Sequence, residues 1–419
     1  MRQFTKQVSL LSLVGLVGCD VAPPDECDGS ARQILETDAA LQEVVEGNTG
    51  LALELFRELA QPDENFFFSP FSISMALGMT EMGAAGNTAS EMKAVLRIPD
   101  EESAWHGALG GLGADIGSGL HCDYDLAIAN QLFAQQGFPI HEEFLSGVLE
   151  AYGAPVESLD FLGETELARV HINDWVSDLT NEKIPDLLKP GILTPDSVMV
   201  LVNAIYFKGD WLQPFEESAT DEDGVFTQDD GTEVNAAIMR GEIDEARYAE
   251  LENGQLLELP YSGDELAMVL ALPEPGLSLA EFEDLLTAED MLNWGQQLAD
   301  TPVFVSLPRF EMRSSASLME SLIALGMVDA FSGVAADFSR MTDPSFGLYI
   351  SAIVHEAYVK VNEEGTEAAA ATAVVASPSS VPDYPTFNAA KPFLFQIQDR
   401  LTGSVLFMGR VVDPSAAPE

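Results

Sequence analysis

Residues Glu363–Pro382 read EEGTEAAAATAVVASPSSVP, and this stretch fits neither regular secondary structure. Its four consecutive alanines favour a helix. It nevertheless follows the alternating, strand-like AYVKV of residues 357–361 and ends in SPSSVPDYP, which neither a helix nor a central strand tolerates. A row of small side chains between a strand and a proline-broken loop indicates a segment that changes its secondary structure when the protein works.

Composition narrows the class of protein. The chain has 419 residues, of which 47% are hydrophobic, enough to build a large core and too much for a disordered protein. Its 19 Lys and Arg residues face 69 Asp and Glu residues, which gives a net charge of −50. A surface this negative repels nucleic acid and anionic lipid headgroups, so we expect neither as a partner. Two explanations of the charge remain open, solubility in salty surroundings and electrostatic steering of a basic partner protein.

The first residues have the pattern of a targeting segment. Arg2 and Lys6 lie at the start of the chain, ahead of an apolar run, VSLLSLVGLV, that is too short to span a bilayer. The run leads into LVGC (residues 16–19), which resembles the lipobox of bacterial lipoproteins, where the cysteine is acylated and becomes the mature N-terminus. We expect a lipoprotein signal peptide over residues 1–18, lipidation at Cys19, and an exported protein anchored in the bacterial cell envelope or at the cell surface. Secretion with an unmodified Cys19 is the alternative.

An acidic tether is expected over residues 19–43, running into a helix. It contains Cys27, which either pairs with Cys122 in a disulfide-permitting compartment or remains, like Cys122, a free thiol. The sequence contains no CxxC pair, so cysteine spacing indicates no zinc site.

Motifs of enzyme chemistry are missing from the sequence. It contains no HExxH, no GxSxG and no GxxxxGK[ST]. His106, His121, His141 and His171 stand in unrelated contexts and are interpreted as surface or packing residues. The glycine-rich residues Gly107–Gly119 lack a preceding strand and a phosphate-binding lysine, so they are interpreted as a loop. We therefore expect no enzyme activity, no metal and no cofactor.

Hydrophobic periodicity predicts a mixture of helices and strands. Leu51–Ala60 is amphipathic with helical spacing, and Ser72–Met82 is a more apolar helix. Val198–Phe207 is a long apolar run rich in β-branched and aromatic residues, as expected of a strand buried on both faces. Ala267–Leu272 and Phe393–Ile397 are further strands. Helices early, strands late and no regular alternation of the two predict an α+β fold built on large sheets.

Five segments resemble motifs of the serpin family and occur in the family's order and spacing. They are NFFFSPFSISMALGMTEMGAAGNTASEM (65–92), NDWVSDLTNEKIPDLL (173–188), LVNAIYFKGDWLQPF (201–215), EEGTEAAAATA (363–373) and KPFLFQIQDRLTGSVLFMGRVVDP (391–414). The similarity covers about residues 44–414. It implies a single serpin domain over residues 44–415, with three β-sheets, about nine helices and an exposed reactive-centre loop at about residues 363–386.

The resemblance also implies a mechanism. A serpin's loop is attacked by a protease as a substrate, and after acylation its N-terminal half inserts as a new strand into the main sheet. Family geometry turns Thr366, Ala368, Ala370 and Thr372 inward, all small and uncharged, while Glu367 falls on the opposite face. We expect Thr366 to lie near the surface before insertion. The predicted hinge comprises Glu363, Gly365, Thr366, Glu367, Ala368, Ala369, Ala370, Ala371 and Thr372.

Family spacing places the reactive bond between Ser379 and Ser380, counted both from Gly365 and from Phe387. No Lys or Arg occurs over residues 366–390, so a trypsin-like enzyme finds nothing for the carboxylate of its specificity pocket. Small residues at 375–377 suit an elastase-like or subtilisin-like protease. The predicted function is a suicide-type inhibitor of serine proteases, or of cysteine proteases. The alternative is a non-inhibitory serpin that acts as a binding or carrier module.

Further family positions carry over individually. Ser69, Ser72, Asn203 and His355 match the polar cluster beneath the point where the main sheet parts, and Trp211 matches the tryptophan at the top of that opening. Residues 92–113 offer only Lys93 and Arg97 as basic residues, so no heparin-like activator is expected. We expect a monomer.

Overall fold

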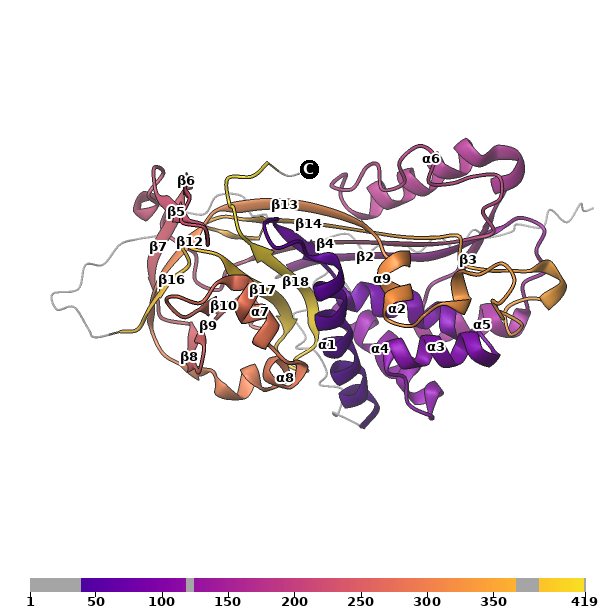
Figure 1. Cartoon of the computed structure of the whole chain (residues 1–419), viewed down its shortest axis with the longest axis horizontal. Helices are drawn as coiled ribbons and strands as arrows, with labels where there is room; N and C mark the ends of the chain where they lie inside the picture. The colour runs from indigo at the N-terminus through magenta and orange to yellow at the C-terminus, as the bar shows by residue number, and fades with distance from the viewer. Residues whose placement is uncertain (1–38, 118–123, 367–383, 418–419) are drawn as a thin grey trace, which may run out of the picture.

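The computed structural model describes residues 39–117, 124–366 and 384–417 (Figure 1). The predicted lipidation site, both of the other cysteines and the reactive bond lie outside these residues, as do hinge positions 367–372. None of the helices in the described ranges is long and apolar enough to cross a membrane.

Nine α-helices are present in the described part of the chain. They are α1 Ala39–Leu59, α2 Pro70–Glu81, α3 Gly86–Leu96, α4 Glu102–Ile116, α5 Glu142–Tyr152, α6 Phe161–Leu179, α7 Leu279–Leu285, α8 Ala288–Gln297 and α9 Met319–Ala324. Short 3-10 turns cover Glu217–Ala219, Asp329–Phe331 and Pro344–Phe346.

The strands form three larger sheets and one small hairpin, which confirms the predicted α+β serpin fold. A six-stranded sheet has the order β13 Phe310–Ser317, β14 Ala352–Val361, β15 Gly365–Thr366, β4 Met199–Asp210, β2 Tyr124–Gln135 and β3 Val156–Leu159. A seven-stranded sheet has the order β1 Phe66–Phe68, β18 Val405–Val411, β17 Phe393–Asp399, β10 Leu266–Pro273, β9 Gly254–Pro260, β8 Arg247–Leu251 and β11 Ala299–Asp300. The three-stranded sheet is β16 Thr386–Asn388, β12 Val303–Pro308 and β7 Ile238–Ile243, and the hairpin is β5 Val225–Thr227 with β6 Glu233–Asn235.

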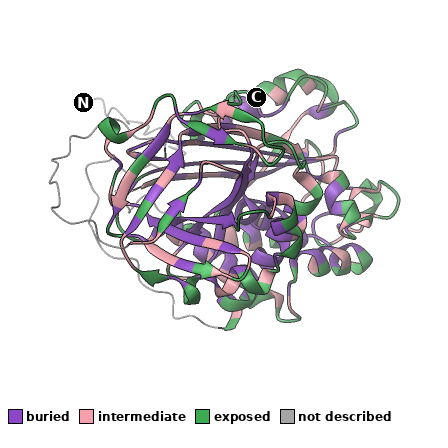
Figure 2. Ribbon diagram, turned by 60° about the vertical axis from the view of Figure 1, so that its left-hand side comes forward, coloured by how far each residue is buried: buried purple, intermediate pink, exposed green. Residues whose placement is uncertain are grey.

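The six-stranded sheet is covered on both faces. In Figure 1, α6 lies on one side of β2, β4 and β14, while α2 lies on the other. Residues Met199–Phe207 of β4 are all buried, as the apolar run predicts, and the strands of the sheets are mostly buried in Figure 2. A strand inserted into this sheet is therefore packed against protein on both faces over much of its length.

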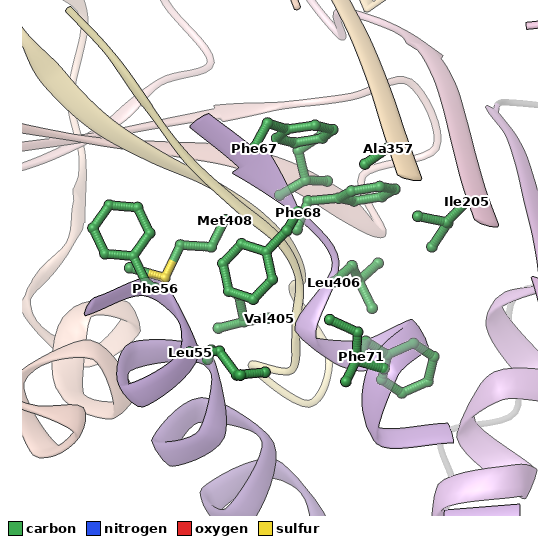
Figure 3. Close-up of a cluster of buried hydrophobic side chains, with 14 of the residues drawn as sticks. Leu55, Phe56, Phe67, Phe68, Phe71, Ile205, Ala357, Val405, Leu406 and Met408 are labelled. Carbon is green, nitrogen blue, oxygen red and sulfur yellow. The ribbon is translucent and has the colours of Figure 1, made fainter. Parts of the chain in front are cut away.

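An aromatic cluster holds α1, α2 and the seven-stranded sheet together (Figure 3). Phe67 of β1 stacks on Phe407 of β18, with ring centroids 5.1 Å apart. Ser69 then caps α2 by accepting a hydrogen bond from the Ser72 amide, and Pro70 begins the helix. This junction matters because it places the two predicted switch serines beneath the six-stranded sheet.

The first helix begins earlier than the sequence indicates. α1 starts at Ala39, so residues 39–43, which we assigned to the acidic tether, belong to this helix. Leu41, in the first turn of this helix, is only 2% exposed and packs in the core. Its burial against the rest of the domain is a long-range contact that the acidic local composition hides.

The prediction of a loop at Gly107–Gly119 is wrong for most of this segment, because α4 runs through to Ile116. Two glycines in it allow close packing rather than chain flexibility. A Cβ at Gly110 would lie 1.7 Å from the carbonyl oxygen of Ala151 on α5, and a Cβ at Gly113 would lie 2.6 Å from the Met75 side chain on α2. Tertiary packing therefore outweighs the low helix propensity of glycine.

Candidate functional site: the seam between β14 and β4

The candidate site is the line along which β14 and β4 meet. The two strands pair in parallel from Ala352–Val200 to Tyr358–Tyr206. Beyond that point they separate, and β15 lies between them, with Thr366 opposite Gly209 on β4 and opposite Val361 on β14. The chain that leaves β14 has thus already turned back and begun a new strand inside the sheet. We call this line the seam.

Thr366 is fully buried at the start of the new strand. Its hydroxyl oxygen lies 2.8 Å from the Tyr261 hydroxyl, and the Tyr261 ring stacks on Trp211 with centroids 4.7 Å apart. Burial raises the pKa of Tyr261 far above its ordinary value, so the phenol stays neutral. The expectation that Thr366 lies near the surface is wrong: its exposure is 0%. A small side chain with one hydroxyl suits this buried place because the Tyr261 hydroxyl supplies its hydrogen-bonding partner.

Tight backbone packing fixes the turn before β15. A Cβ at Gly365 would lie 2.2 Å from the carbonyl oxygen of Gly209, so a larger residue there would push the strand out of the sheet. The Asn362 side-chain oxygen accepts hydrogen bonds from the amides of Glu364 and Gly365, at 3.1 and 3.2 Å. The indole of Trp211 donates to the Asn362 carbonyl at 3.0 Å. Trp211 therefore lies at the top of the seam and holds the turn.

An ion pair between the buried Glu363 and the partly exposed Arg309 lies just ahead of the turn. Arg309 donates from Nε to both carboxylate oxygens, each at 2.8 Å, and Thr220 donates its hydroxyl to the same carboxylate. Burial on its own would raise the pKa of Glu363, but the hydrogen bonds from Arg309 and Thr220 outweigh burial and lower it. Arg309 lies 54 positions away in the sequence, and reading the sequence alone gave no signal of this pair.

A polar cluster lies lower along the seam. The Ser69 amide donates to His355 Nε2 at 3.0 Å, so the ring proton is on Nδ1, which donates to Asn203 Oδ1. Asn203 donates to the Ser72 hydroxyl at 2.6 Å. Burial lowers the pKa of His355 to about 3, so this histidine is neutral and acts as a hydrogen-bonding group. Since Asn203 and His355 are directly paired across the seam, their hydrogen bond closes it.

Asn130 on β2 completes this cluster and is the member that the sequence did not reveal. Its side-chain oxygen accepts from the Ser72 hydroxyl at 2.9 Å, and its amide nitrogen donates to the Ser72 carbonyl at 3.0 Å. The cluster thus ties together β14, β4, β2 and α2. Any strand entering the seam at this level must break the His355–Asn203 bond and replace it.

The other described histidines are His106, His141 and His171, and the ring of His141 contacts the Arg340 carbonyl at 3.2 Å. His106 is buried between Glu81 and Tyr152, with Nε2 3.1 Å from Glu81 and Nδ1 2.6 Å from the Tyr152 hydroxyl. His171 is exposed and lies 2.8 Å from Glu157. Among the described residues no group of three or more His, Cys, Asp or Glu side chains is arranged to hold a metal ion.

Comparisons with known proteins agree with this geometry. Residues 46–414 match the family model described as serpin (serine protease inhibitor). Human Serpin B3 is 38% identical over 391 residues, covering 88% of this chain and 99% of that protein. Human leukocyte elastase inhibitor is also 38% identical, covering 89% of this chain and all of that protein.

Solved structures show the same fold. Human thyroxine-binding globulin, crystallised with its hormone, superimposes with a TM-score of 0.80 at 30% identity, covering 90% of this chain and 100% of the other. The thermophilic serpin tengpin in its native state gives a TM-score of 0.77 at 29% identity, covering 88% and 94%. The family match over most of the chain, the near-complete coverage of the relatives and the β15 strand between β14 and β4 lead to one conclusion: this chain belongs to the serpin family of serine protease inhibitors.

Proposed function

We propose that this protein is a suicide-type inhibitor of serine proteases with elastase-like or subtilisin-like specificity, and that it works by inserting its reactive loop into the seam. The observation that carries this proposal is Thr366, buried and paired with both neighbouring strands at the open end of the seam. Human leukocyte elastase inhibitor, a relative with 38% identity, is consistent with the small-residue target class.

The register of β15 gives the proposed path of insertion. Extending it into the sheet pairs each inward loop residue with one residue on β4 and one on β14: Ala368 with Phe207 and Val359, Ala370 with Ile205 and Ala357, and Thr372 with Asn203 and His355. Alanines thus enter where large apolar side chains already fill the core, and overpacking is avoided. Thr372 arrives between the two residues whose hydrogen bond closes the seam, and its hydroxyl can bond to either of them.

The proposed chemistry is that of the target protease. Its serine attacks the carbonyl of Ser379, the Ser379–Ser380 bond breaks, and the new amine of Ser380 leaves while Ser379 remains as an ester on the enzyme. The freed loop then adds a strand of roughly 12 residues, about 40 Å long at about 3.3 Å per residue, with a ladder of hydrogen bonds on each side. Trapping requires that insertion outpace hydrolysis of the ester.

A protease panel tests this function. The soluble domain is incubated with elastase, subtilisin and trypsin, and the products are separated on denaturing gels and analysed by mass spectrometry. We expect covalent complexes with the first two enzymes, with the new terminus at Ser380, and none with trypsin. Cleavage without a complex for every enzyme would favour a non-inhibitory binding or carrier protein, the second candidate. Thyroxine-binding globulin, a structural relative solved with a bound hormone, is the observation that keeps that candidate open.

The proposed location is the bacterial cell envelope or cell surface, with the chain anchored through lipid on Cys19. The support is the LVGC motif after a short apolar run. The tether would then hold the inhibitory domain at the membrane surface.

A further inference from the structure

Two lysines face each other across the open end of the seam. Lys208 lies on β4 and Lys360 on β14, and both side chains are half-buried. The even-numbered residues of these strands, such as Val202 and Val354, lie on the sheet face that α6 covers, so both lysines belong to that outer face. Thr366, by contrast, points to the inner face, where it meets Tyr261.

Each lysine has an acidic residue directly beside it on the far side. Glu311 on β13 is in register with Lys360, and their charged groups are 3.1 Å apart. Asp125 on β2 is in register with Lys208, but its carboxylate accepts a hydrogen bond from Asn181 at 2.9 Å. The ammonium of Lys208 makes no hydrogen bond or ion pair with the described residues. One row across the sheet therefore has Glu311 and Lys360 on one side and Lys208 and Asp125 on the other. The position between the two lysines is the gap that an inserted strand would fill.

The register of β15 determines which residue fills that gap. Thr366 is opposite Gly209 and Val361, so insertion that continues this register would bring the next loop residue, Glu367, between Lys208 and Lys360. Tyr358 pairs directly with Tyr206, and the same pairing continued by two residues would set Lys360 opposite Lys208. The register of β4 against β14 therefore agrees with the register that β15 makes with each of them. Glu367 lies outside the described residues and is the occupant, while the receiving site consists of the two lysines.

We propose that Lys208 and Lys360 form a receiving site for the Glu367 carboxylate, which binds both ammonium groups in the first step of loop insertion. This inference rests on the proposed inhibitory function. Like charges opposite each other in a sheet are unfavourable, and alternating charges are favourable. Binding of Glu367 completes a row of five alternating charges, from Glu311 through Lys360, Glu367 and Lys208 to Asp125.

The rest of the outer face explains why the charge is needed at this position alone. The next outward loop residue, Ala369, would come between Tyr206 and Tyr358. Ala371 would then come beside Ala204 and Glu356, and Glu356 already pairs with Arg313 at 3.0 Å. A second acidic residue further along the loop would lie beside the Glu356 carboxylate, which already has Arg313 as its partner, and the two negative charges would repel each other. The lysine pair therefore also sets the register, because a slip of two residues would leave Lys208 without an ion-pair partner and Lys360 with Glu311 alone.

The test measures insertion in variants of the full chain. In a trapping inhibitor, the stoichiometry minus one equals the rate of ester hydrolysis divided by the rate of insertion. Lys208→Gln and Glu367→Gln should each raise this quantity about two- to fivefold, the range expected for a partly exposed ion pair. The double variant should be no worse than either single one, and the effect should fade in about 1 M salt.

The matched control is Arg340→Gln, which removes a positive charge from an ion pair with Glu102 far from the seam. It should leave the stoichiometry unchanged.

Two further outcomes distinguish failure of the proposed lysine site from failure of the proposed inhibitory function. Additive effects of Lys208→Gln and Glu367→Gln, or an equal effect of Arg340→Gln, would overturn the lysine site while trapping by the wild type stands. A wild-type protein that gains no thermal stability when its loop is cut would overturn insertion itself, and the lysine site with it.

Discussion

Replacing Thr366 by arginine should convert the protein from an inhibitor into a substrate. Thr366 is fully buried, and its hydroxyl lies 2.8 Å from that of Tyr261. A guanidinium in this place would meet the Tyr261 ring, which is stacked on Trp211, and would lose the hydroxyl contact that threonine makes. Because Thr366 is buried before insertion begins, the change perturbs the resting protein as well as the inserted form.

The structure sets the size of both effects. In the resting protein β15 has only two residues, so the arginine can escape to solvent by unpairing them. That costs roughly 1–3 kcal/mol, from the lost Tyr261 bond and a few strand hydrogen bonds. In the fully inserted sheet the arginine has no escape, and an unpartnered buried charge costs about 3–5 kcal/mol. If even 3 kcal/mol appears in the barrier, insertion slows roughly a hundredfold.

The assay is the number of inhibitor molecules consumed per protease inactivated, measured with an elastase-like enzyme. Thr366→Arg should raise this number steeply and leave the cleavage site unchanged, because the loop beyond residue 366 is the same. Thr366→Ser keeps the hydroxyl and the small size, and it should behave like the wild type. An arginine variant that still traps the enzyme one-to-one would refute insertion through this position.

Three further predictions follow from the other residues. Ser379→Arg should redirect the inhibitor toward trypsin, measured as a covalent complex on a gel; cleavage after residue 379 with no covalent complex would contradict the assigned bond. His355 has a pKa lowered to about 3 from 6.5 by burial, so it lowers the stability of the folded protein as the pH falls from about 6.5 towards 3, where the unfolded chain binds the extra proton. His355→Gln should remove about one proton from the pH dependence of the unfolding free energy, and an unchanged slope would show that the histidine titrates normally. Cys19→Ser should move the protein from the detergent phase to the aqueous phase; unchanged partitioning would exclude lipidation.

Much of the fold could be predicted from local sequence patterns. The apolar run at 198–207 became β4, the run at 267–272 became β10, and the serpin motifs placed β14 next to the loop. These elements are long or carry strong patterns, so local sequence determines them. The helix α4 escaped prediction because its glycines serve packing against Ala151 and Met75, which lie far away in the sequence.

The site was only partly accessible for the same reason. Family motifs led to Ser69, Ser72, Asn203 and His355, and the structure brings all four together through hydrogen bonds. Tyr261, Arg309 and Asn130 were missed because each acts through a partner that is distant in the sequence, and nothing in its own neighbourhood marks it. The assignments at Cys19 and at Ser379–Ser380 remain predictions.

The most direct measurement of the insertion path is a crystal structure of the protein cut within residues 373–383. We predict a full strand between β14 and β4, with Thr372 between Asn203 and His355 and Glu367 between Lys208 and Lys360. A cleaved protein in which Asn203 and His355 remain directly paired would contradict the proposal that this loop works by entering the seam.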